Sequence, residues 1–179
     1  LLASLGYADV AVCQRPRVAI FSTGNEVAAP GEPLPKAGIY DANRFTLMGL
    51  LAEHGADVID LGILPDDLNA IKTALEDAAE QSDLVITSGG VSVGQADFTR
   101  EALEQLGRLA FWRVALRPGR PMACGWLGEK RTPFVGLPGN PVAVMVTFLQ
   151  FVSPLLDRLY GQPTSTPHRL TAIADTAIK

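Results

Sequence analysis

The chain has 179 residues, of which 47% are hydrophobic, so it is long enough for one globular domain with a buried core. Its formal net charge is -4 and no segment is rich in lysine and arginine, which argues against a nucleic-acid partner. No apolar stretch approaches the roughly 20 residues that span a bilayer, and the opening residues show no signal-peptide pattern, so we expect a cytoplasmic protein without a membrane segment.

Hydrophobic periodicity predicts strands that alternate with helices. Residues 66–82 carry one helical stripe of apolar side chains, with Asp66 or Asp67 as the N-cap, and residues 43–56 form a helix that ends at Gly55. Because parallel neighbours need helical crossovers, this alternation predicts an α/β domain with a largely parallel sheet. The other helices are predicted at 98–107 and 140–161, and the strands at 17–22, 57–64, 83–88, 109–116, 121–127 and 132–137, the last two as a hairpin.

Cysteine and histidine side chains offer little chemistry. Cys13 and Cys124 lie far apart without CxxC spacing, so we expect two reduced core thiols rather than a zinc site or a disulfide. His54 and His168 are expected at the surface, without a serine or cysteine partner for a nucleophilic triad. Acyl-transfer chemistry is therefore disfavoured.

Three loops beside these elements are rich in glycine and small polar residues: STGNE at 22–26, TSGGVSVG at 87–94 and GLPGNP at 136–141. Ligands of open α/β sheets bind beyond the carboxyl ends of the strands, where glycine lets main-chain amides approach an anion at a helix N-terminus. A tight turn would explain one such loop, and none is a Walker loop or a dinucleotide fingerprint. Three loops at equivalent ends of one sheet predict a phosphate site.

Four acids fall in the same region, each just past a strand or at a helix start: Glu26, Asp41, Asp66 and Asp97. Helix capping explains Asp66 and Asp97 about as well as function does. Beside a phosphate, however, carboxylates need a divalent cation to offset their repulsion.

The segment RVALRPGRP at 113–121 supplies positive charge. Pro118 and Gly119 force a turn that can direct the guanidinium groups of Arg113, Arg117 and Arg120 at an oxyanion. The alternative is a solvated arginine loop.

Five motifs together carry a family resemblance. RVAIFSTGNEV, GIYDANR, DLVITSGGVSVGQADF, FWRVALRPGRP and GLPGNPV, in this order over about residues 15–160, resemble the MoeA-type molybdopterin molybdenumtransferase family, which includes the E domain of gephyrin. TSGGVSVG alone is shared with MogA-like adenylyltransferases and CinA-like proteins, whereas its combination with STGNE, YDAN and RPGRP is specific to the family. The resemblance implies a three-layer α/β/α fold with a mostly parallel sheet, and the insertion of molybdate into adenylylated molybdopterin with release of AMP.

The resemblance also implies roles for individual residues. Asp66, Asp97 and Glu26 would be catalytic, with Asp66 and Asp97 holding Mg²⁺. Two positions depart from the family pattern: Arg120 stands where lysine is frequent, and Ala143 stands where GNPV is commonly followed by serine, which changes the groups available to molybdate. The residues expected to contact the substrates, with Ser88, Gly89, Gly90 and Ser92 around the pterin-side phosphate, are Thr87, Ser88, Gly89, Gly90, Ser92, Gly94, Arg117, Arg120, Pro121, Pro138, Gly139, Asn140 and Pro141.

The resemblance further implies a domain plan and partners. Residues 15–162 would form the molybdopterin-binding domain, 1–14 would join an N-terminal region, and 163–179, after a Pro/Thr-rich break, would begin a β-rich C-terminal domain. The full-length protein would be a homodimer in contact with a MogA-like adenylyltransferase and molybdoenzyme acceptors. Two alternatives stay open, a MogA-like molybdopterin adenylyltransferase and a non-catalytic binding or scaffold module of the same fold.

Overall fold

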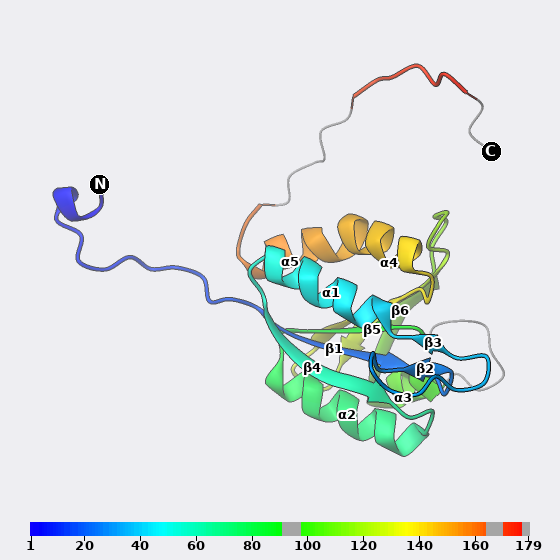
Figure 1. The fold of residues 1–179 in the computed structure, drawn as a ribbon. Helices are drawn as coiled ribbons and strands as arrows, with labels where there is room; N and C mark the ends of the chain where they lie inside the picture. The colour runs from blue at the N-terminus through cyan, green and yellow to red at the C-terminus, as the bar shows by residue number, and fades with distance from the viewer. Residues whose placement is uncertain (91–97, 164–169, 177–179) are drawn as a thin grey trace.

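The computed structural model describes residues 1–90, 98–163 and 170–176, apart from the side chain of residue 112. Its centre is a six-stranded sheet between two layers of helices, which confirms the three-layer α/β/α prediction (Figure 1). The sheet order is β4-β1-β5-β8-β7-β6. Neighbours among β4, β1, β5 and β8 are parallel, whereas β7 pairs antiparallel with both β8 and β6. The strands are β1 (Arg17–Thr23), β4 (Asp57–Leu64), β5 (Leu84–Ser88), β6 (Gly107–Arg113), β7 (Pro121–Leu127) and β8 (Thr132–Leu137).

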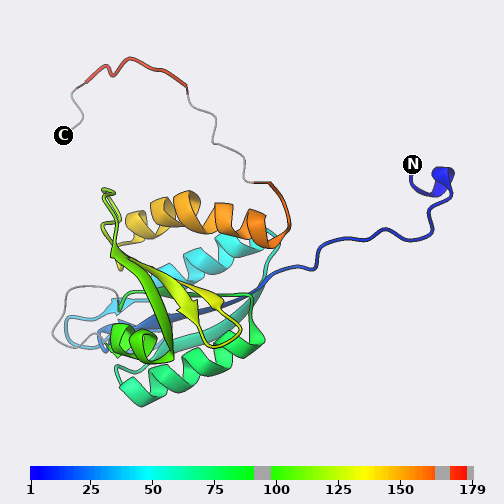
Figure 2. The same cartoon turned by 180° about the vertical axis from the view of Figure 1, so that it is seen from behind.

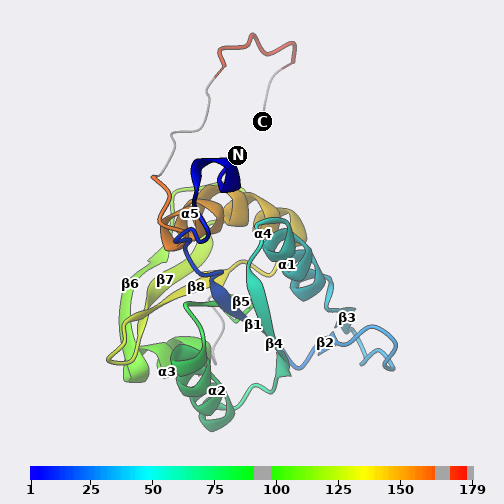
Figure 3. The same ribbon diagram turned by 90° about the vertical axis from the view of Figure 1, so that its left-hand side faces the viewer.

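Helices cover both faces of the sheet (Figures 2 and 3). On one face lie α1 (Ala42–Glu53) and a long helix in three parts, α4 (Pro141–Thr147), the π-helical turn η2 (Phe148–Val152) and α5 (Ser153–Leu159). On the other face lie α2 (Leu68–Gln81) and α3 (Phe98–Leu106). Shorter elements are the 3-10 turn η1 (Ala3–Leu5) and two strands, β2 (Val27–Ala28) and β3 (Ile39–Tyr40), which pair parallel with each other.

Successive strand residues alternate between two hydrophobic cores, because strand side chains point to opposite faces. In β1, Val18 and Ile20 pack with the α1 and α4–α5 layer, whereas Ala19 and Phe21 pack with the α2 and α3 layer. These four side chains are at most 1% exposed. The strand is therefore hydrophobic from Val18 to Phe21, as expected where helices cover both faces.

Most predicted boundaries agree with the structure, and the differences have local causes. Asp67 rather than Asp66 caps α2, since its side chain accepts a hydrogen bond from the Ala70 N–H at 2.8 Å. The strand predicted at 109–116 runs from 107 to 113 and gives way to a turn in which the Val114 N–H donates to the Arg120 carbonyl oxygen.

The long helix contradicts one expectation from composition. Pro141–Leu159 spans 19 residues and is long and apolar enough to cross a membrane by length and composition alone, so the prediction that no such stretch exists was wrong. Four of its apolar side chains have another explanation in the fold. Val144, Phe148, Val152 and Leu156 are fully buried in the core against the sheet.

Two other expectations need correction. Cys13 is exposed rather than in the core, although both cysteines are free thiols. His54 is half-buried at the end of α1, where its Nδ1 contacts the Leu50 carbonyl oxygen at 2.8 Å and its Nε2 contacts the Ser153 hydroxyl at 2.9 Å. Packing of α1 against the long helix places it there, with its ring edge-on to Phe148.

The strand order creates a topological switch point between β1 and β5. From β1 the chain passes through α1 to β4 on one side, whereas from β5 it passes through α3 to the strands on the other side. Connections that leave neighbouring strands in opposite directions open a crevice at the strands' carboxyl ends, where ligands of open α/β sheets bind. Ser22 and Thr23 end β1 there, and Ser88 ends β5.

Candidate functional site

Two serine hydroxyl groups at the carboxyl ends of β1 and β5 contact each other at the switch point. Ser22 Oγ and Ser88 Oγ lie 3.1 Å apart, and the two residues are 2% and 3% exposed. Ser22 also donates a hydrogen bond of 3.0 Å to Oδ1 of Asp41, the N-cap of α1. A polar cluster therefore connects β5, β1 and α1 behind the site.

An arginine supports this cluster from the first turn of α1. Arg44 donates from its main-chain N–H to Asp41 Oδ1 (3.1 Å) and from Nε to Asp41 Oδ2 (2.9 Å), and its Nη1 pairs with Asp60 of β4. Burial alone would lower the pKa of the Arg44 guanidinium, but the hydrogen bonds and charges of Asp41 and Asp60 outweigh it, so this pKa is raised. Asp41, only 3% exposed, is thus held beside a permanent positive charge.

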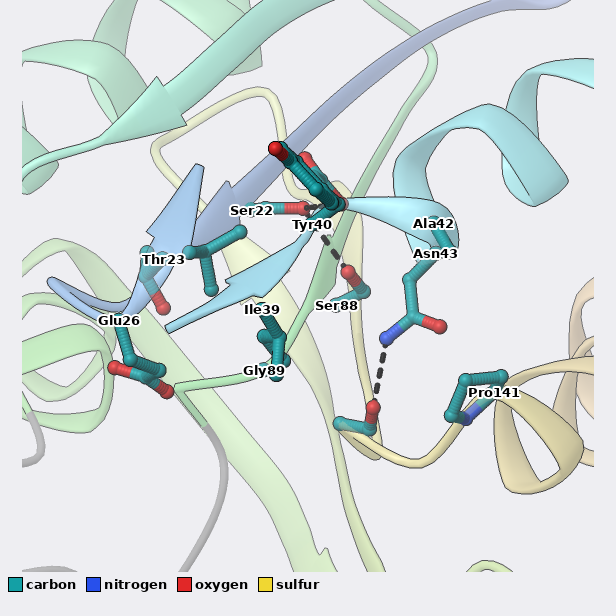
Figure 4. A pocket seen from close by; sticks show the side chains of 13 residues that line it. Ser22, Thr23, Glu26, Ile39, Tyr40, Ala42, Asn43, Ser88, Gly89 and Pro141 are labelled. Atoms are coloured by element: carbon teal, nitrogen blue, oxygen red, sulfur yellow. Dashed lines mark hydrogen bonds between the residues drawn. The ribbon is translucent and has the colours of Figure 1, made fainter. Parts of the chain in front are cut away.

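A pocket of about 100 Å³ lies in front of this cluster, between the ends of β1 and β5 and the start of α1 (Figure 4). We call it the serine pocket, and its lining includes Ser22, Thr23, Glu26, Asp41, Asn43, Ser88, Gly89 and Gly139. Asn43 joins α1 to the loop before α4, because its Nδ2 donates a hydrogen bond of 2.8 Å to the Gly139 carbonyl oxygen. Two buried polar atoms on the lining residues, Asn43 Oδ1 and Thr23 Oγ1, have no hydrogen-bond partner among residues 1–90, 98–163 and 170–176.

A larger cavity of about 500 Å³ adjoins the serine pocket, and the two share Thr23, Glu26, Gly89 and Gly139 in their linings. We call it the loop cavity. Segments that are far apart in the sequence meet in it, namely the end of β1, the TSGG turn, the RPGRP turn and the GLPGNP loop. Its lining residues are Thr23, Glu26, Gly89, Gly90, Pro118, Gly119, Pro121, Pro138, Gly139, Asn140 and Ala143.

Gly89 and Gly90 make the turn after β5 possible, with φ of 83° and 64° in the left-handed region. A Cβ on Gly90 would lie 2.4 Å from Thr23 Oγ1 and 2.7 Å from Thr99 Oγ1, so a side chain has no room there. A Cβ on Gly89 would lie 3.2 Å from the Thr23 carbonyl oxygen. Bare backbone is therefore required where this turn faces the loop cavity.

The RPGRP turn reaches the loop cavity through its small residues rather than through its arginines. Pro118, Gly119 and Pro121 line the loop cavity, whereas Arg117 and Arg120 are exposed and line a neighbouring hollow of about 740 Å³. The turn therefore lies beside the loop cavity. The guanidinium groups face the open space beside it.

The predicted acids lie in different places. Glu26 lines both the serine pocket and the loop cavity. Asp66 is exposed, and its Oδ2 accepts a hydrogen bond of 3.0 Å from the Asn25 N–H, so it lies against the STGNE loop. Asp97 lies outside the described residues. Within the described parts of the chain, no group of three or more His, Cys, Asp and Glu side chains could hold a metal ion.

The remaining predicted residues divide as follows. Pro141 lines the serine pocket, and Asn140 lines the loop cavity while capping α4 through a 3.1 Å hydrogen bond from the Ala143 N–H. Thr87 lies at the end of β5 but is fully buried, and it lines neither the serine pocket nor the loop cavity. Ser92 and Gly94 lie outside the described residues.

Sequence reasoning missed several residues that line the site. The structure adds Ser22, Thr23 and Asn43, with Arg44 behind them. The motif YDAN contained a signal, because an Asp followed by Asn at a helix start supplies both a cap and a polar side chain on the first turn. Which strands those side chains meet depends on the tertiary fold.

A doubly wound sheet with glycine turns and a buried polar cluster at its switch point defines a ligand-binding α/β domain. Comparison with known proteins identifies its family. Residues 19–158 match the family described as "Probable molybdopterin binding domain", and the chain belongs to that family.

Individual relatives agree with this assignment. The chain is 48% identical to the molybdopterin molybdenumtransferase of Haemophilus influenzae, over 100% of this chain and 44% of that protein. It is 36% identical to gephyrin of Dictyostelium discoideum, over 90% of this chain and 26% of that protein. The chain thus spans less than half the length of these relatives.

Solved structures agree in the fold. The molybdopterin biosynthesis MoeA protein of Pyrococcus horikoshii superposes with a TM-score of 0.72 at 36% identity, covering 83% of this chain and 36% of that chain. The molybdopterin biosynthesis enzyme MoaB of Thermus thermophilus superposes with a TM-score of 0.60 at 25% identity, covering 84% of this chain and 99% of that one. The α/β domain is therefore common to longer and shorter proteins.

Proposed function

We propose that this chain is the substrate-binding domain of a molybdopterin molybdenumtransferase, which inserts molybdate into adenylylated molybdopterin with release of AMP. The observation that carries the proposal is the loop cavity, where the TSGG, RPGRP and GLPGNP segments meet beside Glu26. Relatives that match most of this chain are named molybdopterin molybdenumtransferases. STGNE, YDAN and RPGRP favour this activity over the adenylyltransferase alternative.

The chain's own groups suggest how the site would work. The turn at Gly89 and Gly90 lets main chain face the phosphate part of the substrate without side chains in the way. Pro118, Gly119 and Pro138 would form the wall of the loop cavity against which the substrate is oriented, which contributes to catalysis by positioning. Arg117 and Arg120, in the adjoining hollow, would attract an oxyanion such as molybdate towards the cavity.

The expected Mg²⁺ dependence remains part of the proposal. Asp66 lies beside the STGNE loop that carries Glu26, which supports a role for this acid near the phosphate groups. Bound Mg²⁺ would offset charge on the phosphate oxygens. Asp97 is the other proposed ligand.

We extend the proposal to the full-length protein, which would work in the cytoplasm as a homodimer. Residues 1–14 would lead from an N-terminal region, residues 15–162 would form the domain described above, and residues 163–179 would begin a C-terminal β-rich domain. The short matched share of the relatives supports further domains beside this one. A MogA-like adenylyltransferase would supply the substrate, and molybdoenzymes would accept the product.

A reconstitution assay tests the proposed function. The full-length protein is mixed with adenylylated molybdopterin and varied molybdate, and both AMP and the ability of the product to activate an apo-molybdoenzyme are measured. We expect molybdate-dependent release of AMP together with activation. Consumption of ATP with free molybdopterin would identify an adenylyltransferase instead, and binding of the adenylylated substrate without turnover would identify a non-catalytic module.

A further inference from the structure

A tryptophan near the end of β7 has two arginines over its ring. The guanidinium carbon of Arg108 lies 5.7 Å from the centroid of the Trp126 ring, and that of Arg131 lies 4.9 Å from it. Arg108 comes from β6, where it pairs directly with Trp126 across the two strands, whereas Arg131 comes from the turn between β7 and β8. We call these three residues the arginine platform.

The backbone around the arginine platform is specialised. A Cβ on Gly107 would collide with the Trp126 carbonyl oxygen. A Cβ on Gly125 would collide with the Arg108 carbonyl oxygen, so glycine is needed on both sides of this cross-strand pair. Arg131 has a φ of 57°, in the left-handed region that arginine rarely adopts. Glycine or asparagine would relieve that strain, so the arginine at this position points to a role for its side chain.

Both guanidinium groups of the arginine platform lack a counter-charge. Arg108 and Arg131 are exposed, and across the described parts of the chain the ion pairs involve other arginines. Two like charges beside one ring repel each other, so an approaching anion would lower their energy. A guanidinium that lies over an aromatic ring still presents N–H donors at its edge, which match the two oxygens of a carboxylate. The platform is therefore suited to acidic groups.

The arginine platform lies away from the loop cavity. The strand β7 begins at Pro121, which lines the loop cavity, and Trp126 lies about 17 Å further along the strand. The neighbouring β6 is the last strand of the sheet, at the edge opposite β4 (Figure 3). An open sheet edge suits a group that a partner protein presents, whereas a small molecule needs a concave site.

We propose that the arginine platform docks an acidic segment of a partner protein, whose carboxylates pair with Arg108 and Arg131 while its chain packs on Trp126. Arginine and tryptophan are enriched among the residues that contribute most to protein interfaces. The segment would be held by side chains rather than by strand addition, because the register shifts after Leu109 interrupt the edge of β6. This inference goes beyond the proposed function and does not depend on it.

Fluorine NMR of the full-length protein labelled with fluorotryptophan tests the docking directly. The Trp126 resonance, assigned by its loss in Trp126→Phe, reports on the ring at the centre of the platform. Hexaglutamate is the acidic probe and hexaglutamine is the neutral one, both at fixed ionic strength. We expect hexaglutamate to shift the Trp126 resonance saturably with a Kd of about 1 mM or lower, and hexaglutamine to cause no saturable shift.

Variants separate docking from a structural role of the same residues. Arg108→Gln and Arg131→Asn should each weaken hexaglutamate binding at least about fivefold, because each removes one charge-assisted pair. Asparagine tolerates a positive φ, so Arg131→Asn should unfold at the same temperature as the parent or higher. Arg158→Gln, which removes an exposed arginine near the end of α5, is the matched control and should bind like the parent. Thermal unfolding verifies that each variant is folded.

Each outcome decides the matter. No saturable shift with hexaglutamate, an equal shift with hexaglutamine, or unchanged affinity in either variant of the platform would overturn the inference. Binding of inorganic phosphate without binding of hexaglutamate would identify a small-anion site instead. A shift of the Trp126 resonance with protein concentration alone would identify a contact with a second copy of the chain. Either of these two results would also overturn the docking of an acidic partner segment.

Discussion

The main-chain N–H of Asn25 donates a hydrogen bond of 3.0 Å to Oδ2 of Asp66, which joins the loop after β1 to the loop after β4. Asp67, the next residue, instead caps α2. Two adjacent acids thus have separate roles, and they provide a matched pair for mutagenesis.

We predict that Asp66→Asn retains substrate binding in the full-length protein but loses magnesium-dependent release of AMP, because a neutral amide is a poor ligand for a hard cation. The amide oxygen can still accept from Asn25, so the free energy of unfolding should fall by less than about 1 kcal/mol. Asp67→Asn is the control, since asparagine is an equally good N-cap. Turnover of Asp66→Asn at the wild-type rate would show that Asp66 only fastens the two loops.

Gly89 offers a test of the bare turn after β5. Gly89→Ala should lower the free energy of unfolding by about 1 kcal/mol, because its φ of 83° disfavours a side chain, and should also weaken substrate binding. Gly128→Ala is the matched control, with φ of 60° at a hairpin tip where a Cβ meets nothing within 4 Å. It should show the stability loss alone. Equal substrate affinities of the two variants by calorimetry would contradict a ligand-facing role for Gly89.

The arginines of the RPGRP turn are tested by the molybdate concentration that gives half-maximal AMP release. Arg120→Ala should raise this concentration about tenfold, Arg120→Lys should change it little, and Arg120→Glu should raise it further through repulsion. Arg158→Ala, which removes an exposed arginine near the end of α5, is the control at fixed ionic strength. If all three Arg120 variants match the parent, the turn is a solvated loop and the anion is held elsewhere.

The buried pair of Asp41 and Arg44 should matter greatly to stability. Arg44→Met leaves the Asp41 carboxylate buried without its counter-charge, so we expect a loss of about 3–5 kcal/mol in the free energy of unfolding. Arg17→Met removes an exposed ion pair in which Arg17 Nε lies 3.9 Å from Asp83 Oδ2. This change should lower the free energy of unfolding by less than about 1 kcal/mol. Urea unfolding measures both.

The raised pKa of Arg44 determines how the stability loss of Arg44→Met depends on pH. A raised pKa in the folded state contributes stability that is complete below the ordinary arginine value and disappears only as the pH rises through the higher folded value. The deficit of Arg44→Met should therefore be constant between about pH 6 and pH 9. A deficit that varies strongly across this range would mean that another titrating group couples to the pair.

Tyr160 should contribute to the alkaline behaviour of the protein. Its hydroxyl donates to the His54 carbonyl oxygen at 2.8 Å, and its pKa is raised by burial and by Asp57, against a lowering by Arg15. The folded state holds this proton more tightly, so the contribution is present below about pH 10 and is lost as the pH rises through the folded value.

Tyr160→Phe should therefore cost about 1 kcal/mol at neutral pH, and the difference from wild type should narrow above about pH 10. Tyr40→Phe, which removes a longer hydrogen bond of 3.3 Å from an exposed residue, is the control. A constant difference at all pH values would show that Tyr160 ionises equally in the folded and unfolded chains.

The sheet could be predicted because its strands repeat a simple pattern. The bounds predicted at 57–64, 121–127 and 132–137 agree with β4, β7 and β8, since each is an apolar run bounded by turn residues. The strands β2 and β3 have two residues each and carry no period, so sequence could not reveal them. They fold only because main-chain groups such as the Ile39 N–H find the Glu26 carbonyl oxygen.

The site was predictable in its loops and not in its polar cluster. Glycine-rich turns can be recognised from the local sequence, because glycine permits the left-handed backbone conformations that such turns use, as at Gly89. The cluster depends on pairs that are distant in sequence, such as Ser22 with Ser88 and Asn43 with Gly139. The position of Arg120 could not be predicted for the same reason, because the local sequence of the RPGRP turn does not determine that Arg120 lines the neighbouring hollow.

The π-helical turn η2 affects how many residues the long helix Pro141–Leu159 needs to keep its buried side chains on one face. Four residues of α-helix advance about 400°, so side chains spaced by four drift by about 40° at each step. Val144, Phe148, Val152 and Leu156 follow that spacing, yet all four are fully buried. The π-helical turn has more residues per turn than an α-helix, so it cancels this angular drift as the insertion of one residue would. Removal of the exposed Gln150 would space these four side chains by four, three and four residues, which suits an unbroken α-helix. The helix can therefore change its length by one residue and still present the same four side chains to the sheet.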